Sequence, residues 1–257
     1  MIDIEKAKQE FIKYRNIFNK NNENIERKFK HSFDVMKLSE EIAIDLNLNK
    51  EQIELAKLIG LLHDIGRFTE YKPVKKEKTF FNTNKFNHAI EGVKILKNKD
   101  YIREFIYDNQ YDRIIFSAII NHNKNSIEKN LSKEEELFTR ILRDADKLDI
   151  LRLSVTVYWK NNIKEVEEGE ISKEVLKENL SLNTICTKKI NINKHIDKLV
   201  STLSLIYDLN YRKSFQILKK EDYFNKIINR FNFKNEITKK KTNIIKTIGN
   251  QFINSKI

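Results

Sequence analysis

Histidines and aspartates recur along the chain in an order that indicates a metal site. Four of the five histidines stand within apolar stretches of helical periodicity, at His31, His63, His88 and His122. Asp64 follows His63 directly, and an Asp-Ala-Asp run ends at Asp146. Imidazole and carboxylate are ligands that suit divalent Mn, Fe, Ni and Zn, whereas a protein core excludes such groups unless something pairs with them. The series therefore predicts a helical metal site, and one that holds two ions.

The composition favours helices around a substantial core. Glycine and proline are scarce, at 5 and 1 in 257 residues, which leaves little turn chemistry for a many-stranded sheet. Hydrophobic residues make up 40%, and the length suits one domain with or without a helical extension. We expect an all-α fold with a metal-binding core over residues 1–160. Residues 161–257 would be a C-terminal helical extension packed on the same domain.

Cysteine content and apolar runs set further bounds. The single cysteine, Cys186, excludes an intrachain disulfide and a cysteine-rich zinc site. No apolar run approaches the ~20 residues that a membrane-spanning helix needs. The charged start MIDIEKAKQE is unlike a secretory signal. We expect a cytoplasmic protein with no membrane contact.

The chain is strongly basic, with a net charge of +12 from 49 Lys and Arg against 37 Asp and Glu. This excess can attract phosphate-bearing ligands, including nucleic acid. It can also be the solvated surface of a protein rich in lysine and asparagine, and we favour that interpretation for most of the surface. Two local clusters are less easily explained in this way: Lys72, Lys75, Lys76 and Lys78, and Lys239, Lys240 and Lys241.

Apolar periodicity predicts which elements carry the polar groups. Asn49 and Gln52 form a capping pair for a helix that reaches His63, and Gly66 is expected to end that helix as its C′ residue. Ser132 and Glu135 form a capping box for the helix that carries the aspartates. Other helices are expected over residues 3–20, 31–48, 88–97 and 111–122, and then near 172–180, 194–208, 211–219, 220–231 and 235–253. Residues 67–86 exceed the usual loop length and predict a mobile flap beside the site.

With these motifs in view, the chain resembles the HD superfamily of metal-dependent phosphohydrolases. The similar segments lie within roughly residues 25–155 and read KFKHSFDV, LLHDIGRF, FNHAIEGVKIL, AIINHN and ILRDADKLDIL. The resemblance implies an HD-domain helical bundle. It also implies core metal ligands at His31, His63, Asp64 and one aspartate of the last segment.

The family's usual Ala-Asp-x-Leu form selects Asp146 for that last ligand. Helical phase does not separate Asp144 from Asp146, so Asp144 stays an alternative ligand. Asp144 or Asp149 could instead support the ligands through hydrogen bonds. The additional histidines resemble the expanded form of the family, in which His88 and His122 hold a second ion and Asp64 bridges.

The resemblance further implies hydrolysis by a hydroxide that two divalent ions, of Mn, Fe, Ni or Zn, activate. Beside Asp64, Arg67 could take part in catalysis by binding phosphate oxygens with its planar guanidinium; a salt bridge at a helix end is the alternative. Lys75 and Lys76 could bind the anionic substrate, or they could be solvated loop charges. His195 is interpreted as a surface residue.

These inferences predict a metal-dependent phosphohydrolase of phosphomonoesters or phosphodiesters, with a nucleotide or related small molecule as substrate. Two alternatives stay open. Some HD proteins with this ligand order resemble mixed-valent di-iron oxygenases, and the ligands alone do not separate the two chemistries. The basic C-terminal part motivates a nucleic-acid-binding module or a nuclease. The sequence contains no Walker-type loop and no Rossmann glycine pattern.

Overall fold

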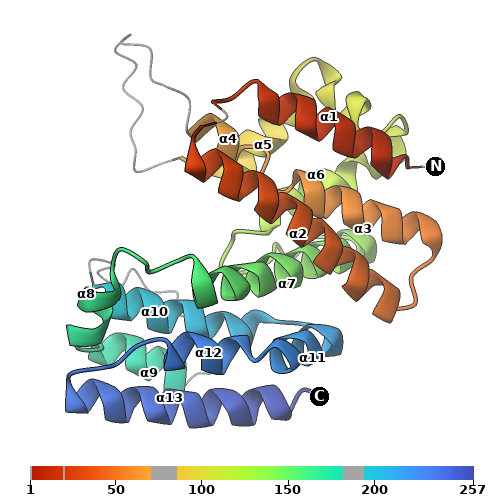
Figure 1. The fold of residues 1–257 in the computed structure, drawn as a ribbon. Helices are drawn as coiled ribbons and strands as arrows, with labels where there is room; N and C mark the ends of the chain where they lie inside the picture. Colours follow the sequence, from red (N-terminus) through yellow and green to blue (C-terminus); the bar gives the residue numbers. More distant parts are fainter. Residues whose placement is uncertain (1, 20, 71–85, 182–193) are drawn as a thin grey trace. The chain divides into compact units, whose positions relative to one another are not determined.

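The computed structural model describes residues 2–19, 21–70, 86–181 and 194–257 (Figure 1). Within these ranges the secondary structure is helical and contains no strand, so the predicted all-α fold is confirmed. The chain divides into two compact units, Met1–Asp146 and Lys147–Ile257. The predicted domains over residues 1–160 and 161–257 stay a prediction.

Unit 1 is built from helices that bury an apolar stripe. Two predicted capping boxes open helices in it: Asn49 with Gln52, and Ser132 with Glu135. The α-helices are α1 (Ile4–Asn16), α2 (Glu23–Asp45), α3 (Lys50–Leu62), α4 (Arg67–Glu70), α5 (His88–Lys97), α6 (Asp112–Asn121) and α7 (Lys133–Thr156), and α7 continues into unit 2. Two 3₁₀ helices, η2 (Asn98–Glu104) and η3 (Asn109–Tyr111), connect α5 to α6.

Helix α2 begins eight residues earlier than predicted, so the expected start at His31 is wrong. The side chain of Asn22 accepts hydrogen bonds from the backbone N–H groups of Asn24 and Ile25, at 2.9 and 3.4 Å. The polar stretch between α1 and α2 therefore ends in an N-cap at Asn22, a position that asparagine fills well. As a consequence His31 lies two turns inside α2.

The expected role of Gly66 as a C′ residue is also wrong. Helix α3 ends at Leu62, and no glycine among the described residues has a positive φ. A Cβ atom on Gly66 would instead lie 2.2 Å from the His88 carbonyl oxygen and 2.6 Å from the Gly92 nitrogen. Gly66 is thus required because its backbone approaches α5 too closely for a side chain.

An aromatic cluster fixes the turn between α3 and α4. Phe68 is fully buried, and its ring centroid lies 5.8 Å from that of Phe11, 5.9 Å from Tyr14 and 5.6 Å from Phe18. The hydroxyl of Tyr14 donates to the carbonyl of Ile65 at 3.4 Å. The contacts of Phe68 with Phe11 and Tyr14 are edge-to-face, and such contacts stabilise more than their buried area alone. Together with the hydrogen bond to Ile65 they anchor the turn to the core of unit 1.

Unit 2 is a second helical assembly. Its α-helices after α7 are α8 (Ile163–Glu168), α9 (Lys173–Ser181), α10 (His195–Leu203), α11 (Arg212–Glu221), α12 (Tyr223–Asn229) and α13 (Glu236–Asn254), with a 3₁₀ turn η4 (Ser204–Asp208) after α10. Arg230 donates from Nη1 to the carbonyls of Ser154 and Tyr158, which satisfies the C-terminal end of α7. His195 is half-buried, with Nε2 3.3 Å from Asn162 Nδ2.

None of the described helices combines the length and the apolarity needed to cross a bilayer. Most of the predicted flap, including Lys72, Lys75, Lys76 and Lys78, lies outside the described residues. Of that segment the structure describes Arg67–Glu70, which form α4, and Phe86.

Candidate metal centre

The six predicted ligands meet inside unit 1 as two groups of three. One group is His31, His63 and Asp146, and the other is Asp64, His88 and His122. Within each group the candidate ligand atoms lie within 4.8 Å of one another. Of the two aspartates left open by helical phase, the structure brings Asp146 to the histidines. Asp144 is fully buried and belongs to neither group.

Most of these ligands stand at helix ends. His63 and His122 are the C-cap residues of α3 and α6, and His88 is the first residue of α5. Asp64 follows the end of α3 in the turn that the aromatic cluster holds. His31 and Asp146 lie within α2 and α7. Five helices therefore converge on one buried point.

Asp64 faces both groups, one carboxylate oxygen toward each. Its Oδ2 lies 3.7 Å from the Nε2 atoms of His31 and His63. Its Oδ1 lies 3.3 Å from His88 Nε2 and 3.8 Å from His122 Nε2. Asp146 contributes only to the first group, with Oδ1 3.1 Å from His31 Nε2. This arrangement gives Asp64 the position of a carboxylate shared between two cations.

The ring orientation of two histidines is set by their own helices. His63 Nδ1 lies 2.7 Å from the carbonyl oxygen of Gly60, and His122 Nδ1 lies 2.6 Å from that of Ile119. A carbonyl oxygen only accepts hydrogen bonds, so both Nδ1 atoms carry the hydrogen. Each Nε2 is then left with a lone pair that points into the site, as metal-bound histidines require.

Each of these lone pairs faces another buried ring nitrogen, which is one physical reason to expect a cation or a proton between them. His63 Nε2 lies 3.2 Å from His31 Nε2, and His122 Nε2 lies 3.0 Å from His88 Nε2. The buried Oδ1 of Asp64 accepts no hydrogen bond from any described residue. Buried acceptors in such contact are costly unless a cation or a donor lies between them. The residues present therefore fit divalent ions.

Electrostatics favour the ligating protonation states. Burial lowers the pKa of His63 to about 4 and that of His88 to about 3, so both imidazoles are neutral at physiological pH. Burial alone would raise the pKa of Asp64, but the Lys28 ammonium holds it well below its usual range. Neutral imidazole and ionised carboxylate are the forms that bind metal.

Sequence reasoning did not identify Lys28 as part of the site. Its Nζ donates to Asp64 Oδ2 at 2.8 Å, and its side chain is 15% exposed. Lys28 precedes His31 by three residues, so the two share one face of α2. The predicted start of that helix at His31 concealed the relation, and an N-cap at Asn22 would have revealed it.

Arg67 stands on the other side of Asp64. Its Nε lies 3.7 Å from Asp64 Oδ1, and its Nη1 donates to Glu70 Oε2 at 3.0 Å. The salt bridge that the sequence offered as an alternative is therefore present. The guanidinium is also 29% exposed and beside the candidate ligands, so a role in phosphate binding stays a prediction.

Two further residues of α7 connect this helix to α6. The sequence did not identify either as a positioning residue. Arg143 is 1% exposed and donates from Nη1 to the carbonyls of Asn121, His122 and Lys124, at 2.8, 3.1 and 2.6 Å. Glu135 accepts from Ser117 Oγ at 2.6 Å and from Arg113 Nε at 3.0 Å. The helix that carries Asp146 is thus fixed to the helix end that carries His122.

The remaining predicted site residues belong to neither group of candidate ligands among the described residues. Asp149 lies in unit 2, where it accepts from Arg152 Nε at 2.6 Å. Supporting roles for Asp144 and Asp149 stay predictions. Substrate binding by Lys75 and Lys76 concerns residues outside the described ranges.

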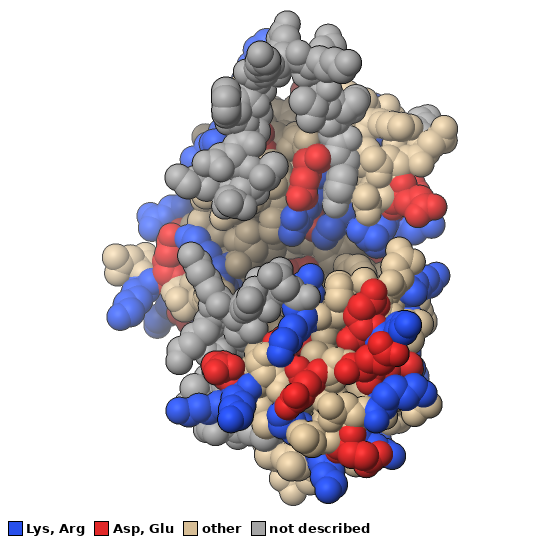
Figure 2. Space-filling view, turned by 90° about the vertical axis from the view of Figure 1, so that its left-hand side faces the viewer, with Lys and Arg blue, Asp and Glu red and all other residues tan. Residues whose placement is uncertain are grey.

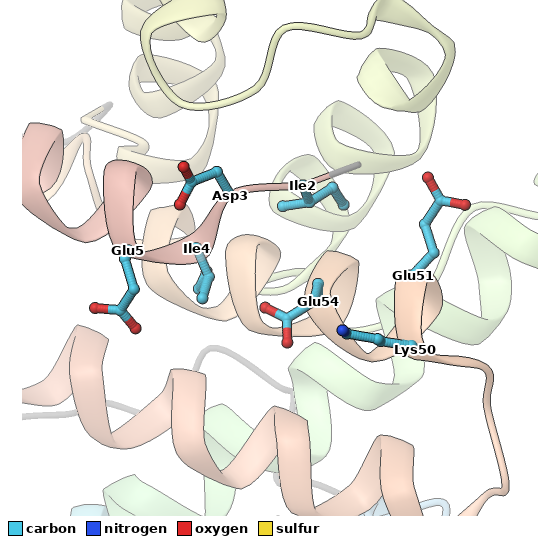
Figure 3. Close-up of a pocket in the computed structure, with 7 residues that line it drawn as sticks. All are labelled: Ile2, Asp3, Ile4, Glu5, Lys50, Glu51 and Glu54. Carbon is cyan, nitrogen blue, oxygen red and sulfur yellow. The ribbon is translucent and has the colours of Figure 1, made fainter.

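A cavity of about 730 Å³ lies elsewhere in unit 1, at the starts of α1 and α3 (Figure 3). It is lined by Ile2, Asp3, Ile4, Glu5, Lys50, Glu51 and Glu54. None of the candidate ligands lines it. Four carboxylates against one lysine repel phosphate, so this cavity is unsuited to a phosphorylated substrate.

The helical fold and the paired histidine–aspartate groups define a class of metal-binding domain, and comparison identifies it. Residues 29–151 match the family model of the HD domain, which confirms the resemblance over this part of the chain. The chain is also 29% identical over 172 residues to Ribonuclease Y of Mycoplasmoides gallisepticum (strain R(low / passage 15 / clone 2)). That match covers 65% of this chain and 26% of the relative, so the chain spans about a quarter of the length of the curated relative it matches. No solved structure matches the chain.

Proposed function

We propose that the HD domain is a two-metal phosphohydrolase that cleaves phosphate esters with a metal-activated hydroxide. The observation that carries the proposal is the orientation of Asp64, whose two oxygens face two separate histidine pairs. A one-metal site would need only His31, His63, Asp64 and Asp146. The second pair, His88 and His122, would then have no function to explain its burial beside a carboxylate.

The roles of the residues follow from their positions. His31, His63 and Asp146 would hold one ion, His88 and His122 a second, and Asp64 both. When bound, the ions supply Lewis-acid polarisation of the phosphate and lower the pKa of a water molecule. Asp64 stays ionised because Lys28 neutralises part of its charge. The hydrogen bonds to Gly60 and Ile119 keep two imidazoles aimed at the site without further reorganisation.

We infer that the substrate is a phosphomonoester or phosphodiester of nucleotide type. Lys28 and Arg67 place one cation on each side of Asp64. Once bound ions share the charge of Asp64, both cations become available to phosphate oxygens, and a guanidinium can bind two of them at once. Lys28 and Arg67, on the two sides of Asp64, could each contact an oxygen of a phosphodiester.

A nuclease activity is the second candidate, and the similarity to Ribonuclease Y favours it. The relative's name describes an enzyme that acts on RNA, whose backbone is a chain of phosphodiesters. The same ligands would serve this reaction, because two ions can stabilise both the attacking and the leaving oxygen. The two candidates differ in the size of the substrate and not in the chemistry of the site.

Metal analysis followed by a substrate panel tests the proposal. The full chain would be purified without oxygen, and its content of Mn, Fe, Ni and Zn would be measured. Hydrolysis of nucleotides, model phosphodiesters and short RNA would then be followed with each metal added. We expect two ions per chain and turnover of at least one phosphate ester.

The matched variants are His122→Ala and His195→Ala. The first removes a candidate ligand, and the second removes the one histidine outside the site. We expect His122→Ala to lose one ion and most activity, and His195→Ala to keep both. Oxygen consumption with an iron electron-spin signal, and no ester hydrolysis, would instead identify a di-iron oxygenase.

A further inference from the structure

The net positive charge is concentrated in the last part of the chain. Residues 209–257 contain 12 Lys and Arg against 3 Asp and Glu. Residues 1–208 contain 37 Lys and Arg against 34 Asp and Glu, so they are nearly neutral overall. A lysine-rich composition alone would spread the excess along the sequence. The C-terminal concentration therefore needs its own explanation.

On the face that Figure 2 shows, acidic and basic side chains are interspersed. Excess charge of one sign is destabilising unless a partner or solvent neutralises it. Residues 209–257, with 12 basic and 3 acidic side chains, are subject to this repulsion. A polyanionic partner would compensate for it.

The basic residues belong to three helices that pack together within unit 2. Helix α12 packs on both α11 and α13. The side chains of Asn225 and Asn250 exchange hydrogen bonds between α12 and α13, at 3.2 and 2.8 Å. The rings of Phe215 and Phe252 join α11 to α13, with centroids 5.9 Å apart. Lysines that are separated in sequence are therefore carried by one compact assembly.

Helix α13 provides the clearest surface. After Glu236, its first residue, the chain contains five lysines and no acidic residue. Lys239 and Lys240 are exposed, and Lys239 Nζ lies 3.6 Å from Glu236 Oε1. Lys241 Nζ donates to the Ile171 carbonyl at 3.0 Å. The same exposed side of the helix carries Asn243, Thr247 and Gln251. Such side chains commonly bind the phosphates and sugars of nucleic acids.

The exposed isoleucines of α13 do not form a membrane-binding face. Ile237 and Ile244 are 55% and 48% exposed, but they are separated by two turns that carry Lys239 and Lys240. An interfacial membrane helix needs a continuous apolar face that is free to insert. The apolar side of α13, with Ile245 and Ile253, is buried in the unit. Nucleic acid is therefore the polyanion that this surface fits best.

We propose that α11, α12 and α13 form a binding surface for single-stranded RNA, held through its phosphate backbone. The choice of RNA over other polyanions rests on the proposed nuclease activity. The attraction itself rests on the charges of this segment. Lys219 and Lys220 of α11, Lys226 of α12, and Lys239 and Lys240 of α13 are exposed and supply the contacts.

Salt-dependent binding tests this surface independently of catalysis. The full chain would be titrated into fluorescently labelled single-stranded RNA in the presence of EDTA, so that metal-dependent cleavage cannot occur. Fluorescence anisotropy would be recorded over a series of salt concentrations. The test variant changes Lys219, Lys220, Lys239 and Lys240 to Gln. The control changes Lys160, Lys164, Lys173 and Lys177 to Gln, which removes the same charge from exposed positions of the same unit.

We expect the wild type and the control variant to bind RNA with similar steep salt dependence. Each phosphate contact contributes about 0.7 to the slope of log K against log salt for single strands, so losing four contacts lowers the slope by about 3. Affinity at physiological salt should fall at least tenfold. Unchanged binding by the test variant, or equal loss in the control variant, would overturn the proposal.

Vesicles that contain anionic lipid provide a second arm. Binding to vesicles without binding to RNA would identify a membrane-surface role and contradict the proposal. Hydrolysis of small phosphate esters and of short RNA is measured separately with metal present. RNA binding without hydrolysis would refute the proposed hydrolase activity and support the RNA-binding surface. Hydrolysis without RNA binding would support the hydrolase activity and refute the RNA-binding surface.

Discussion

Replacing Gly66 with alanine is the sharpest test of how the fold assembles the second group of ligands. The added Cβ would lie 2.2 Å from the His88 carbonyl oxygen, whereas carbon and oxygen atoms normally approach to about 3.3 Å. The start of α5 must therefore move by about 1 Å. His88 is the first residue of that helix, and its Nε2 now lies 3.3 Å from Asp64 Oδ1. The displacement would carry it away from the shared carboxylate.

The size of the effect follows from the contact. Overpacking of this kind costs about 1–3 kcal/mol, and the atoms that must move are backbone atoms, which cannot rotate away. A change of 1 kcal/mol shifts Tm by about 2–4 °C in a chain of this size. We expect Gly66→Ala to lower Tm by roughly 5 °C and to remove the ion between Asp64, His88 and His122. The ion of the first group should remain.

Gly92→Ala is the matched control, because Gly92 faces Gly66 across the same contact. A Cβ atom on Gly92 would meet Ile65 Cγ2 at 3.3 Å and the Gly66 nitrogen at 3.4 Å. These distances require little adjustment, and alanine is favoured over glycine within a helix by up to about 1 kcal/mol. Thermal unfolding and metal analysis of both variants decide the matter. Two bound ions and an unchanged Tm in Gly66→Ala, or equal damage in Gly92→Ala, would refute the reasoning.

Three further outcomes are expected. Asp64→Asn should reduce the content of both ions, whereas Asp146→Asn should reduce one; equal losses in metal analysis would contradict a shared carboxylate. Arg143→Met should lower the free energy of unfolding by about 3 kcal/mol, because a buried guanidinium that donates to three carbonyls is lost; urea denaturation measures this, and an unchanged midpoint would remove the positioning role. Burial alone would raise the pKa of Glu135, but its hydrogen bonds lower it to about 2. Its ionised form therefore stabilises the fold above its ordinary pKa of 4.5, and this stability is lost as the pH falls toward 2. Glu135→Gln should be less stable than the wild type at pH 7 by about 2 kcal/mol, and the difference should shrink in acid; a constant difference would show that ionisation is irrelevant.

Local signals in the sequence predicted the helical class and several element ends. The start of α5 at His88, and the capping boxes at Asn49 and Ser132, depend only on neighbouring residues, and the structure has them where the pattern placed them. Apolar periodicity suffices for such elements, since each buries one stripe. The order of histidines and aspartates was also enough to indicate the HD family, and the match of residues 29–151 to the family model confirms this resemblance.

Most of the errors concern relations between distant segments. Gly66 was assigned to a helix end, yet its role is a close backbone approach to α5 that only the packed structure reveals. Arg143 carries no motif, and its importance follows from the carbonyls that it contacts after folding. Lys28 was missed for a local reason, because the N-cap at Asn22, which extends α2 to include it, was not recognised. Helical phase could not decide whether Asp144 or Asp146 is the candidate ligand. The orientation of α7 against α2, which brings Asp146 to His31, separates them.

The hydrogen bonds from His63 to Gly60 and from His122 to Ile119 have a consequence for evolution of the domain. Those two carbonyls can receive an imidazole because α3 and α6 stop where they do. In a longer helix the backbone N–H four residues on would compete for the same oxygen. The residue at which each helix ends therefore determines the orientation of the imidazole. A single inserted residue near the end of α3 or α6 would therefore turn the imidazole away from the other candidate ligands.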